Sequence, residues 1–506
     1  MALQRATIRL AAAVVVALLA PQLPLASAIS PQGPGNGLGV TPQMGWDNWN
    51  SIACQVDEDV ILDNAKKLVD LGLRDLGYKY VILDDCWSSG RSDNGTLLAN
   101  TTKFPSGMAG LASQIHDMGL KWGMYSSAGK YTCAQYAGSL GFEKQDAQTF
   151  ADWGVDYLKY DNCYNEGQEG TSKLSYDRYK AMSDALNATG RPIFYSMCNW
   201  GTDYPWNFAS TIANSWRIAG DIYDSFDRPD PRCPCTTWDC ALPGFHCSVM
   251  NILNKVASIV DKGRPGGWND LDALEGPRQI PLIMGNDLTL MDAPSLSILS
   301  NPAILAISQD SLGTAAFRVW QKPAYSSQNN TYSADLYTAG ETYFWTGRLA
   351  GGDQVIAFVN AGAQQQSLSA TIDEVFVDYV TTGSSKPSVQ TANTWDVYDL
   401  WANRMDDATA KTIIDGGIQS LTAPTPSNGT NTTTAAAAAY TPFNVTVTPY
   451  ADAVKKNDTA VLGVKVATLM AGGSVKADVP SHGVAAFRLR SQKMIPVAGK
   501  RKRDEL

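Results

Sequence analysis

Lys159 and Asp161, two positions apart, are the residues of this sequence best placed for acid–base or nucleophilic chemistry. Tyr157 and Leu158 lead into them, and alternate side chains of a strand share a face, so the two charges would lie side by side. A nearby ammonium favours the ionised form of a carboxyl group. An ionised aspartate at the carboxyl end of a strand is suited to act as a nucleophile. The alternative is a structural ion pair, and this segment alone does not decide between the two.

Polar residues also end other short apolar segments throughout residues 40–313, where such segments alternate with helical stretches. In chain order these residues are Trp49 and Asn50, Asp84 and Asp85, Tyr125 and Ser126, Asp161, Asn199, Asp221, Asp270 and Asp272, and Asn286 and Asp287. Eight βα units are what a (β/α)8 TIM barrel requires, and the active site of such a barrel lies at the carboxyl ends of its strands. The sequence therefore predicts a barrel with these side chains gathered around one site.

After Gly313 the pattern changes to short strands with alternating apolar residues, at 342–348, 354–360, 395–401 and 484–489. This pattern is typical of an antiparallel β-sandwich. The expected domains are a catalytic barrel over residues 29–313 and a C-terminal sandwich over 314–492. Residues 422–439 are rich in Thr, Asn and Ala, which predicts a disordered, glycosylated insertion, and 493–506 form a basic tail.

The composition excludes several classes of protein. A chain of 506 residues with 44% hydrophobic and 18% charged residues is globular with a large core. A net charge of −9 argues against nucleic acid or an anionic membrane as partner. The three histidines, His116, His246 and His482, are far apart in sequence, which argues against zinc or Ser-His-Asp chemistry.

The N-terminus has the features of a secretory signal peptide over residues 1–28: Arg5 and Arg9, an apolar run over 10–20, and Ala26-Ser27-Ala28 before the expected cleavage point. We see no other candidate membrane span. Eight glycosylation sequons agree with secretion: Asn94, Asn100, Asn187, Asn329, Asn428, Asn431, Asn444 and Asn457. The C-terminal Arg-Asp-Glu-Leu differs by one residue from the endoplasmic reticulum retrieval signal, so retention there is the alternative.

Several motifs in one order resemble the family 27 glycoside hydrolases, and among them the fungal α-galactosidases (melibiases). They are Met44-Gly45-Trp46, Leu83-Asp84-Asp85-Cys86-Trp87, Lys159-Tyr160-Asp161, Cys198-Asn199-Trp200-Gly201, Ser215-Trp216-Arg217 with Asp221, Gly267 through Asp272, and Thr394 through Arg404. The resemblance covers residues 35–492. It implies a retaining exo-α-galactosidase that acts on melibiose, raffinose-type oligosaccharides or galactomannan side chains and needs no metal or cofactor.

The chemistry of the family implies roles for the residues of these motifs. In a retaining glycosidase one carboxylate attacks the anomeric carbon while a second carboxyl group protonates the leaving oxygen and later activates water. By resemblance Asp161 is the nucleophile, kept ionised by Lys159, and Asp221 is the acid/base, which must hold a proton when substrate arrives. The implied substrate contacts are Asp84 and Asp85 as acceptors, Lys159 and Arg217 as donors, Trp49 and Tyr125 as walls for the apolar sugar face, Cys198 beside the sugar, and Asp272 at the rim.

Structural roles are open for some of these residues. Asp84 and Asp85 could be a helix-start pair, and Arg217 could be the structural partner of a barrel carboxylate. We expect Trp46 to pack below the pocket and Asp270 to be structural.

Nine cysteines in an oxidising compartment predict up to four disulfides. The resemblance implies the pairs Cys54–Cys86 and Cys133–Cys163, the second beside Asp161. Cys233, Cys235, Cys240 and Cys247 lie in an insertion and are expected to form two local bridges of unassigned connectivity. Cys198 is then the free thiol.

One feature departs from the family. Only seven residues, 273–279, separate Asp272 at the end of predicted strand seven from Ile280 at the start of strand eight. Neighbouring parallel strands need a crossover of about a dozen residues or more, usually a helix. We therefore expect the barrel to lack this helix, with a tight link, an apolar groove outside it, and Asp161 and Asp221 still in place. Either the gene model has dropped an exon or the encoded protein is damaged.

Three alternative functions remain. An α-N-acetylgalactosaminidase would need small residues beside the sugar 2-position, where Cys198-Asn199-Trp200 is bulky. A β-L-arabinopyranosidase would accept galactose without its 6-CH₂OH group. A galactose-binding protein without catalytic activity is the rival from another class. The intact carboxylates argue against it, and the short link between strands seven and eight argues for it or for no folded product.

Overall fold

The structure is a computed structural model that describes residues 34–226, 247–272, 282–323, 340–377, 389–422 and 440–492. Within these ranges no helix is long and apolar enough to cross a membrane. Several predictions lie outside them: the signal peptide, the insertion beyond residue 422, the basic tail, three of the four insertion cysteines, and the link from strand seven to strand eight.

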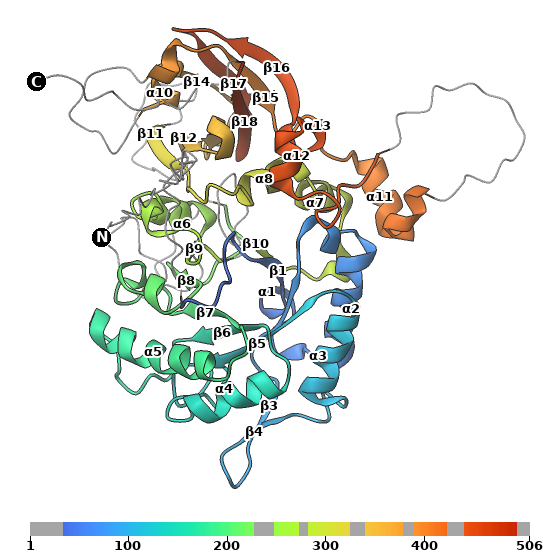
Figure 1. Cartoon of the computed structure of the whole chain (residues 1–506), viewed down its shortest axis with the longest axis vertical. Coiled ribbons are helices and arrows are strands. Elements are labelled where there is room, and N and C mark those ends of the chain that lie inside the picture. The colour runs from blue at the N-terminus through green and yellow to red at the C-terminus, as the bar shows by residue number, and fades with distance from the viewer. Residues whose placement is uncertain are drawn as a thin grey trace, which may run out of the picture. The chain divides into compact units, whose positions relative to one another are not determined.

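Eight parallel strands form one sheet, as the sequence predicts (Figure 1). They are β1 (Met44–Asp47), β2 (Tyr80–Leu83), β5 (Lys121–Ser127), β6 (Tyr157–Asp161), β7 (Phe194–Cys198), β8 (Ser215–Arg217), β9 (Trp268–Asp270) and β10 (Leu282–Met284). Their spatial order is β10-β1-β2-β5-β6-β7-β8-β9. The two edges of this curled sheet are therefore β9 and β10, and no pairing joins them within the described residues.

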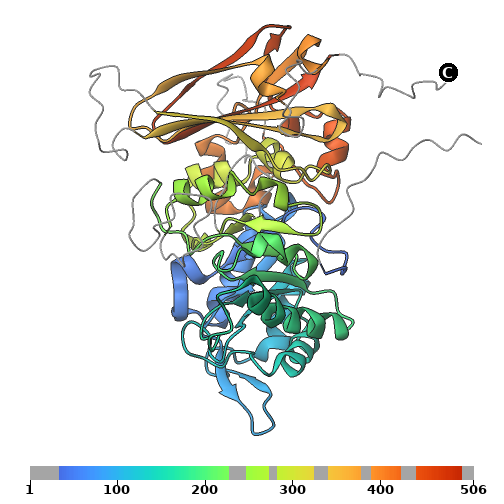
Figure 2. The same ribbon diagram turned by 90° about the vertical axis from the view of Figure 1, so that its left-hand side faces the viewer.

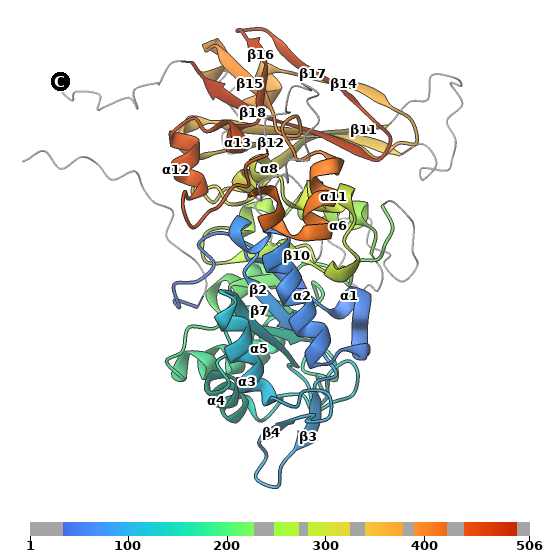
Figure 3. The same ribbon diagram turned by 90° about the vertical axis from the view of Figure 1, so that its right-hand side faces the viewer.

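Helices cover the outer face of the curled sheet, as Figure 3 shows for α2 and α3. The barrel half contains α1 (Trp49–Ile52), α2 (Glu58–Asp70), α3 (Gly107–Asp117), α4 (Glu143–Asp152), α5 (Ser172–Ala188), α6 (Val249–Val256), α7 (Ala293–Leu299) and α8 (Pro302–Ser308), and a hairpin of β3 (Ser88–Arg91) and β4 (Leu97–Ala99). Side-chain caps set where helices begin: Asp57 accepts a hydrogen bond from the Val60 N–H, and Thr171 accepts one from Leu174. Trp46, Trp122 and Trp216 are fully buried in the core, so Trp46 is a packing residue, as expected.

The C-terminal part is a two-layer antiparallel sandwich, which confirms the predicted fold class (Figure 2). A six-stranded sheet contains, in spatial order, β11 (Phe317–Pro323), β12 (Glu341–Arg348), β13 (Gln354–Asn360), β18 (Gly483–Ser491), β15 (Trp395–Asp399) and β16 (Val464–Leu469). The second layer is the pair β14 (Gln366–Thr371) and β17 (Ser474–Val479). One apolar cluster joins the layers, with Phe344, Phe358 and Trp395 on one side and Val475 and Val479 on the other.

Short helices connect the sandwich to the barrel. They are α11 (Asp407–Gly416), α12 (Tyr450–Lys455) and α13 (Thr459–Leu462), whereas α10 (Ile372–Val375) packs within the sandwich core. Asn301, the cap of α8, donates to the Leu400 carbonyl at 2.8 Å, and Ser297 of α7 donates to the Met405 carbonyl. Alternating patterns do not reveal these helices, and the sequence did not predict them.

The seam between β9 and β10 is where the chain departs from a complete barrel. Leu271 and Asp272 are the only described residues between the two strands, and neither is helical. Residues 273–281 lie outside the described ranges, so the predicted tight link and the apolar groove outside it stay predictions. The strands themselves keep their register, since β10 pairs with β1 and β9 pairs with β8.

Candidate active site

The carboxyl ends of the strands bring the predicted site residues together. Asp161, the last residue of β6, is in register with Cys198 at the end of β7, and Arg217 at the end of β8 is in register with Asp270 of β9. Parallel pairing without offset places all these ends at one edge of the sheet. The sequence motifs thus converge as a barrel requires.

Asp161 is buried, with 6% of its surface exposed. Its Oδ1 accepts the Asn162 N–H at 2.8 Å, and its Oδ2 accepts the Tyr125 hydroxyl at 2.9 Å. Both hydrogen bonds orient the carboxylate and favour its charged form. Tyr125 is buried and bound to Asp161, which adds a role to the sugar-facing wall expected for it.

The expectation that Lys159 holds the pKa of Asp161 low is wrong. Burial raises the pKa of Asp161 to about 7; the Lys159 charge acts in the opposite direction, and the nearby Asp221 raises the pKa further. The Lys159 ammonium instead lies 2.6 Å from Asp84 Oδ2 and 3.7 Å from Asp47 Oδ2. Alternation along β6 predicted that Lys159 and Asp161 share a face. It did not predict that the carboxylates of Asp84 and Asp47, on neighbouring strands, would pair with Lys159.

Asp84 and Asp85 differ in their surroundings although both are buried. Asp84 accepts hydrogen bonds from the Asp85 N–H, at 2.8 Å, and from the Lys159 ammonium. Its carboxylate therefore forms a charged pair with Lys159. Asp85 accepts the N–H groups of Cys86 and Ala134 at 2.7 and 2.8 Å. These bonds give Asp85 a clear role in holding the loop after β5. The helix-start alternative is wrong for both residues, because the pair leads into β3 and not into a helix.

Asp47 is a member of the site that the sequence reasoning missed. It ends β1, is 8% exposed, accepts the Trp49 N–H at 2.9 Å, and approaches both Lys159 and Asp84. Burial and the neighbouring Asp84 raise the pKa of Asp47 to about 8. Its position after Gly45-Trp46, at a strand end like the other polar residues, was the signal that could have identified it.

Lys159, Asp84 and Asp47 form one charged group of the site, and Arg217 forms a second one with Asp221 and Asp272. Arg217 Nη2 lies 3.0 Å from Asp221 Oδ1 and 3.1 Å from Asp272 Oδ2, and its Nη1 lies 3.6 Å from the Cys198 sulfur. The Asp221 side chain is 39% exposed, in contrast to the enclosed Asp161. Asp272 also accepts the Ile222 N–H at 2.8 Å, which ties the segment after Asp221 to the end of β9. Arg217 is therefore a partner of barrel carboxylates as well as a candidate donor to substrate.

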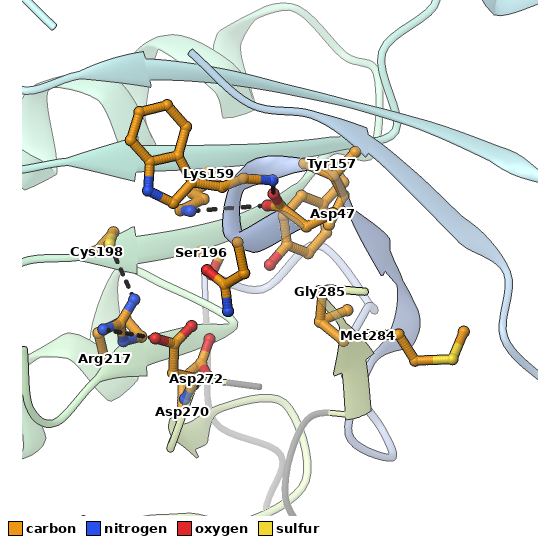
Figure 4. Close-up of a pocket in the computed structure, with 14 residues that line it drawn as sticks. Asp47, Tyr157, Lys159, Ser196, Cys198, Arg217, Asp270, Asp272, Met284 and Gly285 are labelled. Atoms are coloured by element: carbon orange, nitrogen blue, oxygen red, sulfur yellow. Dashed lines mark hydrogen bonds and ion pairs between the residues drawn. The ribbon is translucent and has the colours of Figure 1, made fainter. Parts of the chain in front are cut away.

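A pocket lies between these two charged groups (Figure 4). Lys159 and Asp47 lie on one side of it, and Arg217, Asp270 and Asp272 lie on the other, with Ser196 between. Five predicted contact residues line it, namely Trp49, Lys159, Cys198, Arg217 and Asp272. Asp84, Asp85, Tyr125, Asp161 and Asp221 are not among its lining residues. We assign the site by the convergence of Asp161 and Asp221, and this pocket is the adjoining cavity that extends toward β9 and β10.

Both disulfides implied by the family resemblance are present. Cys54–Cys86 and Cys133–Cys163 have Cα separations of 5.2 and 5.1 Å. The sulfurs of Cys133 and Cys163 lie within 4.8 Å of an Asp161 carboxylate oxygen, as expected, and their mutual bond leaves no thiolate there to bind a metal. Cys198 is a buried free thiol, and Cys247 is disulfide-bonded. Cys233, Cys235 and Cys240 lie outside the described residues.

Comparisons with known proteins give one consistent result. Residues 41–276 match the family described as alpha galactosidase A, and residues 339–431 match the alpha galactosidase C-terminal beta sandwich domain. An alpha-galactosidase of Lachancea cidri is 51% identical over 90% of this chain and 95% of its own length. Alpha-galactosidase 1 of Saccharomyces cerevisiae is 48% identical over 90% and 94%, respectively.

Solved structures agree with the sequence relatives. A Saccharomyces cerevisiae alpha-galactosidase is similar with a TM-score of 0.80 and 47% identity, over 92% of this chain and all of its own. A structure of the enzyme from that yeast with raffinose has the same TM-score, with 46% identity over 91% of this chain. A β-L-arabinopyranosidase from Geobacillus stearothermophilus is only 17% identical, with a TM-score of 0.58 over 91% of this chain and 98% of its own, so that likeness concerns the fold alone.

Proposed function

This chain belongs to the alpha-galactosidase family, and on that premise we propose that Asp161 and Asp221 hydrolyse terminal α-galactosides by double displacement. The family assigns the chain the activity of a glycoside hydrolase. The observation that supports the residue roles is the pairing of an enclosed Asp161, oriented by Asn162 and Tyr125, with a more exposed Asp221 near enough to affect its pKa.

In the first step the Asp161 carboxylate attacks the anomeric carbon while Asp221 gives its proton to the glycosidic oxygen. The bond from the anomeric carbon to the leaving oxygen breaks, the aglycone leaves as an alcohol, and galactose remains as an ester of Asp161. The Tyr125 hydroxyl, which binds Asp161 Oδ2, fixes which carboxylate oxygen faces the sugar. Enclosure of Asp161 excludes bulk water from the ester until the leaving group has gone.

In the second step Asp221, now a carboxylate, takes a proton from water, and the resulting hydroxide equivalent attacks the anomeric carbon. The ester to Asp161 breaks, and galactose is released with its original anomeric configuration. The partial exposure of Asp221 suits this role, because the water must reach it. Arg217 holds Asp221 and Asp272 in place through both steps.

Substrate recognition is assigned to the charged groups beside this pair. Asp84 and Lys159 form a short ion pair whose remaining donors and acceptors suit adjacent sugar hydroxyls. Trp49 and Cys198 line the neighbouring pocket. We propose melibiose, raffinose-type oligosaccharides and galactomannan side chains as substrates, and the yeast relative determined with raffinose supports this class.

Leaving-group dependence tests the two roles. Asp161→Asn should abolish turnover of every galactoside, because no glycosyl-enzyme can form. Asp221→Ala should retain activity on aryl galactosides with good leaving groups, which need little protonation, and should lose melibiose hydrolysis. The measurement is kcat/KM on p-nitrophenyl α-galactoside and on melibiose for both variants. Equal losses of Asp221→Ala on the two substrates would contradict its role as the acid.

The other activities weighed for this chain are not favoured by its relatives, which are named alpha-galactosidases at 48–51% identity. Initial rates on p-nitrophenyl α-galactoside and its 2-acetamido analogue discriminate between the hydrolases. Faster turnover of the acetamido compound would contradict the galactosidase assignment. Galactose-dependent thermal stabilisation without hydrolysis would support a binding protein instead.

We propose secretion as the location of the protein. The signal-like N-terminus, the sequons and two disulfides support export. Expression in a eukaryotic host should release a glycosylated protein beginning at Ile29. Retention that disappears when residues 503–506 are deleted would instead assign the protein to the endoplasmic reticulum.

A further inference from the structure

An arginine lies on the buried face of α5. Ser175, Arg178, Tyr179 and Met182 are buried at the spacing of one helix face, and Arg178 has only 3% of its surface exposed. A buried cation lowers stability unless hydrogen bonds or a counter-ion replace the water it has lost. In the described part of the chain, the three hydrogen bonds of this guanidinium go to neutral oxygens and not to a carboxylate. Stability alone is therefore a weak reason for an arginine at this position.

The three hydrogen bonds of Arg178 reach the two loops on either side of Asp161. Nη1 donates to the carbonyl of Ala128, directly after β5, at 2.9 Å. Nη2 donates to Oδ1 of Asn162, directly after β6, at 2.6 Å, and Nε donates to the Gln168 carbonyl in the same loop at 3.1 Å. Because a guanidinium is a rigid planar fork, it fixes its acceptors relative to one another. Arg178 thus holds the two loops at a set separation.

Two of these acceptor residues also bind the nucleophile through their backbone N–H groups. The Asn162 N–H donates to Asp161 Oδ1 at 2.8 Å, and the Ala128 N–H donates to the Asp161 carbonyl at 2.8 Å. One guanidinium therefore restrains both residues that fix the backbone of Asp161 and one of its carboxylate oxygens. The Tyr125 hydroxyl binds the other carboxylate oxygen.

Arg191 forms a similar clamp at the opposite end of β6. Its Nε donates to the Val155 carbonyl at 2.7 Å, and its Nη2 donates to the Gly154 carbonyl at 2.9 Å and to Asp156 Oδ1 at 2.6 Å. These acceptors precede β6, away from the catalytic end of the strand. The side chain of Arg191 is 33% exposed. The two arginines thus separate anchoring of β6 from contact with the neighbours of Asp161.

We propose that Arg178 is a positioning residue for the nucleophile, acting through Asn162 and Ala128 to hold the Asp161 carboxylate in line with the anomeric carbon. This inference rests on the proposed galactosidase function and extends it to a residue outside the substrate pocket. None of the hydrogen bonds that Arg178 makes among the described residues reaches Lys159 or Asp84, the groups assigned to sugar binding. Loss of the clamp therefore slows the chemical steps and leaves galactose affinity nearly unchanged.

Arg178→Lys tests the clamp because lysine retains the charge but has one nitrogen in place of the fork. It should lower kcat on p-nitrophenyl α-galactoside by about 10- to 100-fold, as small displacements of a reacting group do. The dissociation constant of galactose, measured by calorimetry, should stay within about threefold of wild type, since its binding groups are untouched.

The pH profile gives a second readout. The Asn162 N–H lowers the pKa of Asp161, so a weaker bond should move the acid limb of kcat/KM to higher pH in Arg178→Lys. Lys159, Asp84 and Asp221, the charged groups that also act on this pKa, are the same in both proteins. An acid limb at or below the wild-type position would contradict the route through Asn162.

Arg191→Lys is the matched control, because it breaks a clamp of the same chemistry on the same strand. It should lower the melting temperature without changing kcat or the pH profile. Wild-type kinetics in Arg178→Lys would overturn the positioning role. So would kcat, galactose affinity and melting temperature that fall together in both variants, because that result would show a general structural effect.

A double-mutant cycle checks that Arg178 acts through Asn162. Asn162→Ala removes the acceptor but keeps the backbone N–H on Asp161, so it should also lower kcat, and the double variant should lose at most about threefold more than the worse single variant. Losses that multiply would contradict the shared route. If Arg178→Lys does not fold, a wild-type kcat in Asn162→Ala overturns the inference and a reduced kcat with unchanged galactose affinity supports it. A wild-type protein that does not hydrolyse the galactoside would refute the galactosidase function itself.

Discussion

At the scale of single residues, the site divides into two charged groups with Asp161 close to both. Lys159 pairs with Asp84 and Asp47, and Arg217 pairs with Asp221 and Asp272. Each cation therefore restrains carboxylates that would otherwise repel one another in a buried space. Asp161 is oriented by neutral donors, the Tyr125 hydroxyl and the Asn162 N–H, and not by a direct ion pair.

Tyr125→Phe should shift the acid limb of the kcat/KM profile to higher pH. The tyrosine hydroxyl donates to Asp161 and stabilises its charged form, so its removal raises the pKa of Asp161 further, by roughly one unit. Activity should fall most at acidic pH, where less of the nucleophile is ionised. The measurement is the pH profile on p-nitrophenyl α-galactoside, and an acid limb that stays or moves to lower pH would contradict this role.

Asp47→Asn should make the protein more stable at alkaline pH. The pKa of Asp47 is raised from 3.8 to about 8, so between these values the folded form keeps a proton that the unfolded form has released. The free energy of unfolding therefore decreases as pH rises through this window. Asparagine does not titrate, so the melting temperature of the variant should exceed that of wild type at pH 8, and the difference should shrink toward pH 4.

Asp161 and Asp270 also have raised pKa values but are present in both proteins, so the comparison isolates Asp47. A variant less stable than wild type at pH 8 would show instead that ionised Asp47 supports the fold through Lys159.

Residue identities were more predictable from sequence than residue partners. Motifs indicated Asp161, Asp221, Lys159 and Arg217, because strand ends with polar side chains follow a local pattern. The pairing of Lys159 with Asp84 joins residues 75 positions apart, and it depends on barrel curvature that no local pattern contains. Asp47 had a local signal, its position at the end of β1, but its contacts with Asp84 and Lys159 on other strands could not be predicted from it.

At the scale of elements, the loops after β5 and β6 fit together with no spare space at Gly129. A Cβ atom at this position would lie 1.8 Å from the Cys163 carbonyl oxygen and 2.6 Å from that of Tyr164. Both are backbone atoms that cannot rotate away. Gly129 thus permits the close approach of the loops that hold Asp161 and the Cys133–Cys163 disulfide.

Gly129→Ala should separate these loops, lower stability by about 1–3 kcal/mol or more, and reduce kcat because Asp161 moves. Gly110→Ala is the control, since its Cβ would meet only the Ser106 side chain within α3, where alanine suits a helix. The measurements are urea unfolding and kcat on p-nitrophenyl α-galactoside. Wild-type kinetics in Gly129→Ala would mean that the loop contact does not position the nucleophile.

The strands were predictable as elements, and the short helices beside them were not. Apolar runs ending in polar residues indicated all eight barrel strands, with differences of at most three residues at their ends. α7 and α8, with seven residues each, are determined by packing against the sandwich and by the caps Asp292 and Asn301, so periodicity gave no signal for them.

At the scale of the whole molecule, the seam between β9 and β10 is the unusual feature. These strands are the two edges of the sheet, and edge strands leave backbone groups unpaired. The described pairings place Asp161 on β6, far from either edge in strand order. Asp161 therefore depends on the intact middle of the sheet, whereas Asp221 follows β8, beside the β9 edge, and is linked through Arg217 to Asp272 at the seam.

Inserting an amphipathic helix of about twenty residues between Asp272 and Ile280 should raise the melting temperature and the soluble yield, because a parallel crossover needs such a length. A Gly/Ser insertion of equal length is the control and should do neither. If the helical insertion gives no gain over this control, the seven-residue link is compatible with a stable barrel. Transcript sequence across codons 270–285 would show whether the natural protein already contains the longer segment.

The central claim, a covalent galactosyl ester on Asp161, is tested most directly by trapping that intermediate. A 2-deoxy-2,2-difluoro α-galactoside with a trinitrophenyl leaving group should glycosylate the enzyme, after which the ester should hydrolyse slowly. Fluorine destabilises both transition states, and the reactive leaving group offsets this in the first step only. Peptide mass spectrometry should then locate one difluorogalactosyl group on Asp161, and none in Asp161→Asn. A label on another carboxylate, or hydrolysis of α-galactosides with no label on any residue, would contradict the account.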